Sequence, residues 1–309
     1  MNYSLEVLVV VVTYEPTEIQ LNCIGDIIGS FRNVYIYDNS VSQISKERIR
    51  KLVLTYKANK LYSSKNIYFE QPGLNVGLPA AYNSSIKICD SFGYKYLFFL
   101  DQDAKISIEA LEKTVAIYND LEKSFKVGAL NLGAVQQDSR PYDFLFNGKF
   151  KWKGFYYSKE IIEKRYLTNS TLFISVDIFK SIGGYNESFF LDNSDMEISL
   201  RLRRAGYRLF LINTVNYTHN YGEVIPVSSY GIKMAYRPPE REYFAKDLIR
   251  CLFLSKDVSF VDTALISLLI VSKLISILFL KDKKSDRLRY MVKGIKELIG
   301  EINKDKPRM

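Results

Sequence analysis

The sequence predicts an α/β fold with a doubly wound, mostly parallel sheet, followed by a helical C-terminal extension. Predicted strands and helices alternate four times in about the first hundred residues, which is the pattern of successive βαβ units. These strands span residues 7–12, 33–37, 66–70 and 96–100. Most are short apolar runs with little alternation, as expected for strands buried on both faces of a sheet.

Helices are expected over residues 16–29, 46–58, 80–92 and 106–118. From residue 127 the elements become shorter, with strands expected over 127–132 and 207–212 and helices over 176–181, directly after the stretch 172–175, and over 195–205. The first residues contain no basic segment and no small-residue cleavage site, so we expect a first strand there rather than a signal peptide.

Composition narrows the class of protein. The chain has 309 residues, of which 47% are hydrophobic, so it can bury a large core. Its net charge of +9 suits phosphate-rich partners, namely nucleic acid, a nucleotide-activated substrate or an anionic membrane. The basic residues gather near the C-terminus rather than in a groove with interleaved aromatic residues, which disfavours nucleic acid. Three widely spaced cysteines give no disulfide framework, so a reducing cytosol is expected.

The C-terminal extension is apolar and then basic. Residues 260–280 carry only two charges, Asp262 and Lys273, and are long enough to cross a bilayer. Lys273 and several serines nevertheless form a polar stripe, and a charge near the bilayer centre costs about 3 kcal/mol. Residues 281–309 include ten Lys and Arg but only five Asp and Glu. We therefore expect a helix lying on the anionic cytoplasmic surface of the membrane; the alternative is a helical pair packed on the catalytic domain or on a second subunit.

Two carboxylates follow the most apolar strand. Asp101 and Asp103, separated by Gln102, lie where a strand of a parallel sheet reaches its carboxyl edge, which is where open α/β folds bind ligands. Two hard oxygen donors suit Mg²⁺ or Mn²⁺, which complete their coordination with phosphates and water. The alternative is an acidic turn that caps the next helix.

A second pair of acids lies at 195 and 197. Asp195 and Glu197 fall in the first turn of a predicted helix, where acids also interact favourably with the helix dipole. A carboxylate beside a bound sugar is, however, the group that glycosyl transfer needs to deprotonate an acceptor hydroxyl. Both interpretations fit this position.

Taken together, six motifs resemble the family 2 glycosyltransferases of the GT-A fold, and within them the bacterial rhamnosyltransferase-like group. In chain order they are Thr13-Tyr14-Glu15-Pro16, Asp38-Asn39-Ser40, Asn75-Val76-Gly77 with Asn83, Asp101-Gln102-Asp103, the stretch from Ser194 to Arg201, and His219-Asn220-Tyr221-Gly222. The resemblance covers residues 7 to about 250. It implies a GT-A catalytic domain over 1–250, with a nucleotide-binding half (1–105) and an acceptor-binding half (106–250), before a membrane-associating tail (251–309).

The resemblance also implies roles for individual residues. The general base is Asp195, and the metal ligands for Mg²⁺ or Mn²⁺ are Asp101, Asp103 and His219. A lone histidine is ordinarily a surface or core residue, but His219 is the only one in the chain and follows a predicted strand. The implied nucleotide and substrate residues are Thr13, Tyr14, Glu15, Asp38, Asn75, Gly77, Asp101, Gln102 and Arg201.

The implied activity is metal-dependent inverting transfer of a sugar in bacterial cell-surface polysaccharide synthesis, such as capsule or O-antigen assembly. The expected donor is dTDP-L-rhamnose and the expected acceptor a lipid-linked saccharide at the inner face of the cell membrane. A UDP-hexose or UDP-galactofuranose donor on the same scaffold is the alternative within the class. A catalytically silent saccharide-binding scaffold is the alternative outside it, and the four retained residues Asp101, Asp103, Asp195 and His219 argue against that.

The chain departs from the family pattern at several positions. Ser194 replaces the glutamate before the catalytic aspartate, and Glu197 replaces the following aspartate. Ser170-Thr171 stands where many relatives have Ser-Gly, and the downstream R-x-Y-Y pattern is present only in part, from Arg241. These changes concern the sugar and the acceptor more than the type of reaction.

Overall fold

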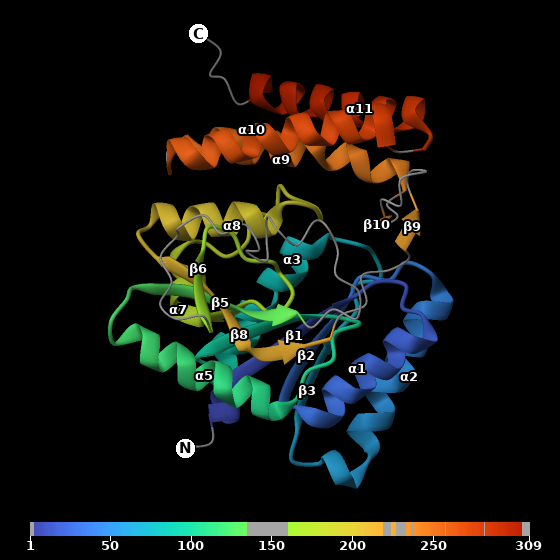
Figure 1. Ribbon diagram of the computed structural model, residues 1–309. Coiled ribbons are helices and arrows are strands. Elements are labelled where there is room, and N and C mark those ends of the chain that lie inside the picture. The colour runs from blue at the N-terminus through green and yellow to red at the C-terminus, as the bar shows by residue number, and fades with distance from the viewer. Residues whose placement is uncertain are drawn as a thin grey trace. The chain divides into compact units, whose positions relative to one another are not determined.

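The computed structural model describes residues 3–134, 160–218, 224–226, 233–235, 238–256, 258–280 and 282–304 (Figure 1). By their internal contacts the residues form two compact units. The first unit consists of Met1–Phe190 and Ser194–Asn220, and the second of Leu191–Asn193 and Tyr221–Met309.

The first unit is built on an eight-stranded sheet in the order β3-β2-β1-β4-β7-β5-β8-β6. Its strands are β1 (Val7–Thr13), β2 (Asn33–Asp38), β3 (Asn66–Glu70), β4 (Tyr96–Asp101), β5 (Val127–Ala134), β6 (Ile161–Lys164), β7 (Phe173–Ser175) and β8 (Arg208–Tyr217). The strands β3, β2, β1 and β4 pair in parallel, as do β5 and β8. Only β7 and β6 run antiparallel to their neighbours, so the predicted mostly parallel sheet is confirmed.

Helices cover both faces of this sheet (Figure 1). One face packs against α1 (Glu18–Ser30), α2 (Gln43–Ala58) and α5 (Ile108–Glu122), and the other against α3 (Leu78–Asn83), α4 (Ser85–Phe92), α7 (Val176–Ser181) and α8 (Ser194–Arg204). Along β4, Phe98 and Leu100 belong to the first of these two cores, whereas Leu97 and Phe99 belong to the second. This alternation explains why β4 is apolar throughout. Short 3₁₀ turns, η1 (Tyr3–Glu6) and η2 (Lys60–Tyr62), complete the unit.

Three local elements differ from the sequence prediction. The expected helix 80–92 is interrupted at Ser84, because the hydroxyls of Ser84 and Ser85 donate to the carbonyls of Ala81 and Tyr82 at 2.6 Å each. Strand β8 extends to Tyr217, beyond the expected end at residue 212. Strand β6 was not predicted.

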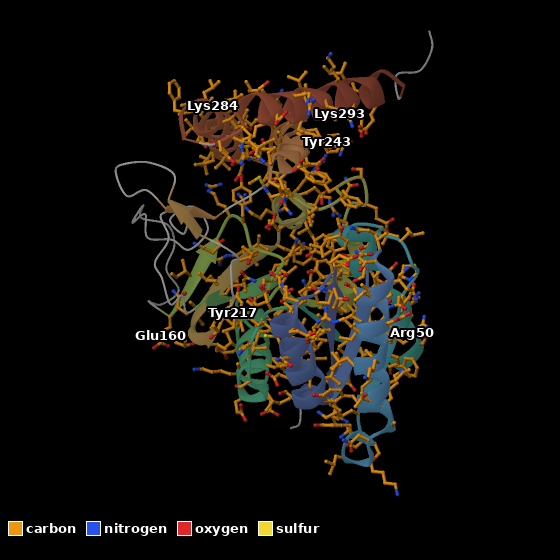
Figure 2. All side chains as sticks on the ribbon, turned by 90° about the vertical axis from the view of Figure 1, so that its right-hand side faces the viewer. Arg50, Glu160, Tyr217, Tyr243, Lys284 and Lys293 are labelled. Atoms are coloured by element: carbon orange, nitrogen blue, oxygen red, sulfur yellow. The ribbon has the colours of Figure 1, made fainter. Side chains whose placement is uncertain are left out.

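The second unit is mainly helical. It contains η3 (Pro239–Phe244), α9 (Ala245–Ser255), α10 (Phe260–Ile275), the π-helical turn η4 (Ser276–Leu280), α11 (Lys284–Lys304) and a hairpin of β9 (Val224–Pro226) and β10 (Lys233–Ala235). Helix α11 lies so close to η3 that a Cβ at Gly294 would overlap the carbonyl oxygen of Tyr243. The ammonium of Lys293 lies 6.0 Å from the centre of the Tyr243 ring (Figure 2).

Buried ion pairs hold α10 to the rest of the second unit. Glu242 of η3 is 1% exposed, and its two carboxylate oxygens lie 2.7 Å from Lys273 Nζ and 3.2 Å from Arg287 Nη1. Removing one partner of such a pair leaves a buried charge uncompensated, at a cost of about 3–5 kcal/mol. Lys273, the charge inside the apolar segment, therefore has a partner within its own unit. Cys23, Cys89 and Cys251 are buried and form no disulfide among the described residues.

Candidate active site

Three predicted site residues meet at the carboxyl edge of the parallel strands. Strand β1 lies between β2 and β4, and in this register Thr13 is opposite Asp38 while Val12 is opposite Asp101. Thr13, Asp38 and Asp101 therefore lie at one edge of the sheet. This edge is where doubly wound folds bind their ligands.

Asp38 is fixed in a single orientation. The Thr13 hydroxyl and the Ser40 backbone N–H donate to its Oδ1 at 2.8 and 3.0 Å. The side-chain amide of Gln71 donates to its Oδ2 at 2.8 Å. The carboxylate is fully buried, so these bonds replace the water that it loses.

Glu15 braces two loops of this edge. Its carboxylate accepts from the backbone N–H groups of Val41 and Ser42 at 2.7 and 2.8 Å and from the Ser42 hydroxyl. The hydrogen bonds from Ser42 lower the pKa of Glu15 from 4.5 to about 2. Ser42 is also the N-cap of α2, and the Glu15 backbone, at φ 42°, donates to Ser40 Oγ at 3.0 Å. Glu15 thus joins the loop after β1 to the loop after β2.

Gln102 makes the corresponding connection between β1 and β4. Its side-chain carbonyl accepts from the Tyr14 N–H at 2.9 Å, and its amide donates to the Tyr14 carbonyl at 3.2 Å. Both polar groups of the Tyr14 backbone are therefore bound to one side chain, while the Tyr14 ring remains 50% exposed. The structure gives Gln102 a role in shaping the loop that carries Tyr14.

The two acids of the D-x-D stretch lie on a tight turn. The Asp101 carbonyl accepts from the Ala104 N–H at 3.0 Å, and the side chains of Asp101 and Asp103 are half-buried. Two carboxylates on a partly exposed turn fit a hard divalent cation that keeps phosphate or water ligands. Within the described residues no group of three or more His, Cys, Asp and Glu side chains could hold a metal ion. The third predicted ligand, His219, lies outside the described residues.

Asp195 lies in the first turn of α8, as predicted, and its side chain is half-buried. Its Oδ1 accepts from the Met196 N–H at 2.8 Å. Its position relative to Asp101 is indicated by Tyr82, a fully buried tyrosine of α3. Burial raises the pKa of Tyr82 well above its ordinary value, and the charges of Asp101 and Asp195 raise it further. Residues from β4 and α8 therefore act on the same hydroxyl.

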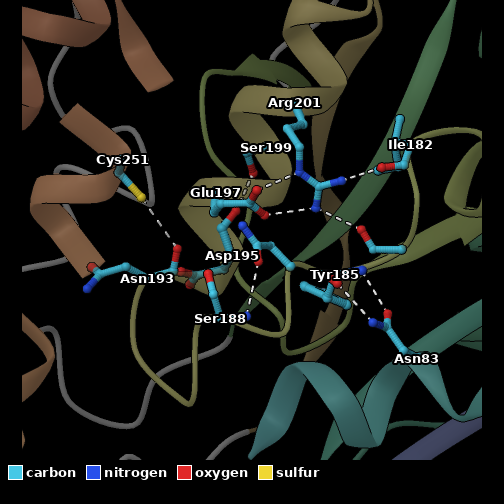
Figure 3. Close-up of polar contacts among 12 residues, drawn as sticks. Asn83, Ile182, Tyr185, Ser188, Asn193, Asp195, Glu197, Ser199, Arg201 and Cys251 are labelled. Atoms are coloured by element: carbon cyan, nitrogen blue, oxygen red, sulfur yellow. Dashed lines mark hydrogen bonds and ion pairs between the residues drawn. The ribbon is translucent and has the colours of Figure 1, made fainter. Parts of the chain in front are cut away.

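Arg201 is engaged in holding a turn against α8 (Figure 3). Its guanidinium binds both carboxylate oxygens of Glu197, at 2.5 and 2.8 Å, and donates to the carbonyls of Ile182 and Gly184. Glu197 is 2% exposed, so the pair is a buried, bidentate bridge. A substrate contact by Arg201 stays a prediction.

The Asn75–Gly77 element is held to the loop after β2. Asn75 Oδ1 accepts from the Gly77 N–H at 2.9 Å. Asn39 donates to the Gly77 carbonyl at 3.1 Å and accepts from the Val76 N–H at 3.3 Å. Gly77 has a φ of 86°, and a Cβ there would lie 2.6 Å from the carbonyl oxygen of Phe190. Glycine is required at this position both by conformation and by space.

The Ser-Gly departure at 170–171 also has a structural consequence. Thr171 has a φ of 62°, a region that β-branched residues rarely adopt, and it is fully buried. Its hydroxyl accepts from the Leu132 N–H and from the Asn131 amide, both at 3.1 Å. These two bonds offset the backbone strain that a glycine would not have.

Several residues that shape the site were not among the predicted ones. Asn39, Ser40 and Gln71 fix the loops at the carboxyl edge of β1 and β2 through hydrogen bonds to Gly77, Glu15 and Asp38. Asn83 pairs with both backbone groups of Tyr185, at 2.7 and 2.8 Å (Figure 3). Asn39, Ser40 and Asn83 belong to the quoted motifs, which was the available signal, whereas nothing in the sequence pointed to Gln71.

No family model matches the chain. The dTDP-rhamnosyl transferase RfbF of Shigella flexneri is 25% identical over 293 residues, which cover 93% of this chain and 92% of that protein.

Solved structures share the fold. TarS 1–349 of S. aureus in complex with UDP-GlcNAc aligns with a TM-score of 0.55 and 15% identity, over 95% of this chain and 80% of that chain. GalNAc-T7 with UDP, GalNAc and Mn²⁺ aligns with a TM-score of 0.50 and 14% identity, over 69% of this chain and 43% of that chain. These comparisons confirm the predicted GT-A fold, the resemblance to the rhamnosyltransferase-like group, and the prediction that the chain is an enzyme of the glycosyltransferase class.

Proposed function

We propose that this protein is a metal-dependent inverting transferase that moves L-rhamnose from dTDP-L-rhamnose to a lipid-linked saccharide in cell-surface polysaccharide synthesis. The observation that carries the donor is the similarity to a dTDP-rhamnosyl transferase along nearly the whole of both chains. The geometry that supports the chemistry is the gathering of Thr13, Asp38 and Asp101 at the carboxyl edge of the parallel strands.

The nucleotide is proposed to lie along the strand ends at Thr13 and Asp38, beside the exposed ring of Tyr14. Asp101 and Asp103 are proposed to hold Mg²⁺ or Mn²⁺, together with His219. When bound, this cation supplies stabilisation of the negative charge on the departing nucleoside diphosphate.

Asp195 is proposed to accept the proton of the acceptor hydroxyl at its carboxylate. The hydroxyl oxygen forms its bond to the anomeric carbon as the bond from that carbon to the diphosphate oxygen breaks, and the electron pair leaves on the diphosphate. A single displacement with a single base inverts the anomeric centre, and no covalent intermediate is needed.

The test of the donor is release of nucleoside diphosphate from a panel of nucleotide sugars, with Mg²⁺, with Mn²⁺ and with EDTA. Selective, metal-dependent turnover of dTDP-rhamnose is the expected result. Selective turnover of a UDP-hexose or UDP-galactofuranose would overturn the rhamnose proposal and leave the transferase proposal standing. Saccharide binding without turnover of any donor would favour a silent scaffold.

The membrane part of the proposal concerns α10. Phe260–Phe279 is the single segment, within the described part of the chain, that is long and apolar enough to cross a membrane. Most of it is unburied, and its exposed side chains include Leu268, Val271 and Phe279. Lys273 is bound to the buried Glu242 of the same unit, which supports a helix lying on the membrane surface over one crossing it.

Sedimentation with vesicles tests this placement. The full chain is expected to bind vesicles containing anionic lipid, to bind neutral vesicles less, and to leave them in high salt. Leu268→Glu should weaken binding, whereas Leu54→Glu, the same change at an exposed leucine of α2, should not. Binding that resists salt and alkaline washing would indicate a spanning helix. A chain that ignores vesicles and elutes as a dimer would indicate a subunit contact.

A further inference from the structure

The start of α8 is held by two consecutive, partly buried hydrogen bonds. Asn169 donates from its side-chain amide to the Ser194 hydroxyl at 3.0 Å, and its side-chain carbonyl accepts from the Tyr185 hydroxyl at 2.8 Å. Ser194 and Tyr185 are 1% and 2% exposed. Ser194 stands directly before Asp195, at the position where the resembled family has glutamate.

Tyr185 is a rigid end point for these two hydrogen bonds. Asn83 binds both backbone groups of Tyr185 (Figure 3), and the Tyr185 ring packs within 6 Å of the rings of Tyr82, Phe99 and Phe179. Burial and the charges of Asp195 and Glu197 raise the pKa of the Tyr185 hydroxyl well above its ordinary value. The hydroxyl therefore remains a hydrogen-bond donor, and the direction of both hydrogen bonds is fixed from Tyr185 through Asn169 to Ser194.

The first turn of α8 follows a change of backbone direction. Asn193, directly before the helix, has a φ of 66°, in the left-handed region that asparagine adopts more readily than most residues. A first turn that frays or shifts moves Asp195, and a displacement of about 1 Å in a reacting group can cost about a hundredfold in rate.

We propose that Tyr185 and Asn169 are positioning residues, which set the place of Asp195 by holding Ser194 at the start of α8. This inference rests on the proposed role of Asp195 as the base. It also gives the departure from glutamate at Ser194 a physical meaning, because a short hydroxyl side chain accepts the Asn169 amide in a buried site.

A second buried tyrosine, Tyr82, provides a matched control. Tyr82 and Tyr185 are both buried, their rings lie 5.3 Å apart, and the charges of Asp101 and Asp195 act on both. Among the described residues, however, the Tyr82 hydroxyl has no hydrogen-bond partner. Tyr185→Phe removes the hydrogen bond from Tyr185 to Asn169, whereas Tyr82→Phe removes a hydroxyl that makes no hydrogen bond among the described residues.

The experiment measures kcat and KM for the nucleotide sugar that the wild type uses, and amide hydrogen exchange at Ser194–Glu197, in the full chain. For Tyr185→Phe we expect kcat to fall about tenfold, KM for the donor to change by less than about twofold, and exchange to accelerate about tenfold. Tyr82→Phe should leave the exchange at the start of α8 at the wild-type rate and should lower kcat by less than Tyr185→Phe does. In an Asn169→Ala background, Tyr185→Phe should have no further effect on kcat.

Equal effects of Tyr185→Phe and Tyr82→Phe on kcat would overturn the inference. So would a lower kcat for Tyr185→Phe without faster exchange at the start of α8, or independent effects of Tyr185→Phe and Asn169→Ala. If the wild type turned over no nucleotide sugar, the proposed function would fail. The exchange comparison would then still decide whether Tyr185 holds Ser194.

Discussion

Replacing Gly77 by alanine should destabilise the protein far more than the same change at Gly73. Both glycines have a positive φ, of 86° and 84°. At Gly77 a Cβ would lie 2.6 Å from the carbonyl oxygen of Phe190 and 2.9 Å from its ring, whereas at Gly73 it would meet nothing within 4 Å. The pair therefore separates backbone strain from collision.

The magnitude follows from these two contributions. Strain at a positive φ costs about 1–2 kcal/mol for alanine, and this is all that Gly73→Ala should lose. The Phe190 carbonyl cannot easily move away from Gly77, because it also accepts from the Leu78 N–H at 2.8 Å. Crowding of a packed site adds about 1–3 kcal/mol, so Gly77→Ala should lose about 2–5 kcal/mol in total.

Urea unfolding of the two variants and the wild type measures these losses. The denaturant slope should be the same in all three, so that the midpoints report stability. Nucleotide binding, measured by calorimetry, should weaken in Gly77→Ala and stay near wild type in Gly73→Ala. Equal midpoints and equal nucleotide affinities for the two variants would refute the reasoning from the Phe190 contact.

Two further predictions concern α11 and Glu15. Gly294→Ala should destabilise the protein by about 1–3 kcal/mol, because a Cβ would overlap the Tyr243 carbonyl. Gly300→Ala has open space around it and should stabilise the protein by up to about 1 kcal/mol. Thermal unfolding should therefore show a lower melting temperature for Gly294→Ala and an equal or higher one for Gly300→Ala. Because the pKa of Glu15 is lowered from 4.5 to about 2, its stabilising contribution is complete above pH 4.5 and is lost as the pH falls towards 2. The difference in unfolding free energy between wild type and Glu15→Gln should therefore shrink over this range, as measured by urea midpoints at several pH values. A difference that stays constant with pH would contradict the stabilising role of the Glu15 hydrogen bonds to Val41 and Ser42.

The parallel half of the sheet was predictable because its signals are local. Each strand of β1 to β4 is an apolar run, and each ends in a polar residue or a turn. The order of the strands was not predictable in detail. The insertion of β7 between β4 and β5 brings together residues distant in the chain. Strand β6 is the four-residue stretch Ile-Ile-Glu-Lys, which is short and has no apolar-polar alternation, so it gives no clear strand signal. The break at Ser84 depends on side-chain hydroxyls, which a helical apolar pattern does not reveal.

The sequence predicted which residues gather at the site, but not which of them hold loops. Motifs identified Asp38, Asp101 and Asp195, and the structure places Asp38 and Asp101 at one sheet edge. Motifs could not distinguish residues that face a ligand from those that hold loops, since both are polar and lie at strand ends. Glu15 and Gln102 were expected to bind substrate; the described contacts show both side chains joining loops at the sheet edge, and substrate binding by them stays a prediction. Only tertiary hydrogen bonds reveal that difference.

The role of Asp195 as the base is tested by comparing wild type and Asp195→Asn for turnover of dTDP-rhamnose with Mn²⁺ or Mg²⁺, beside calorimetric binding of dTDP. Loss of a general base lowers the rate by about 10²–10⁴-fold. We expect a loss of kcat of that size in Asp195→Asn, with dTDP affinity unchanged. A variant that retains wild-type kcat would contradict the assignment of Asp195 as the base.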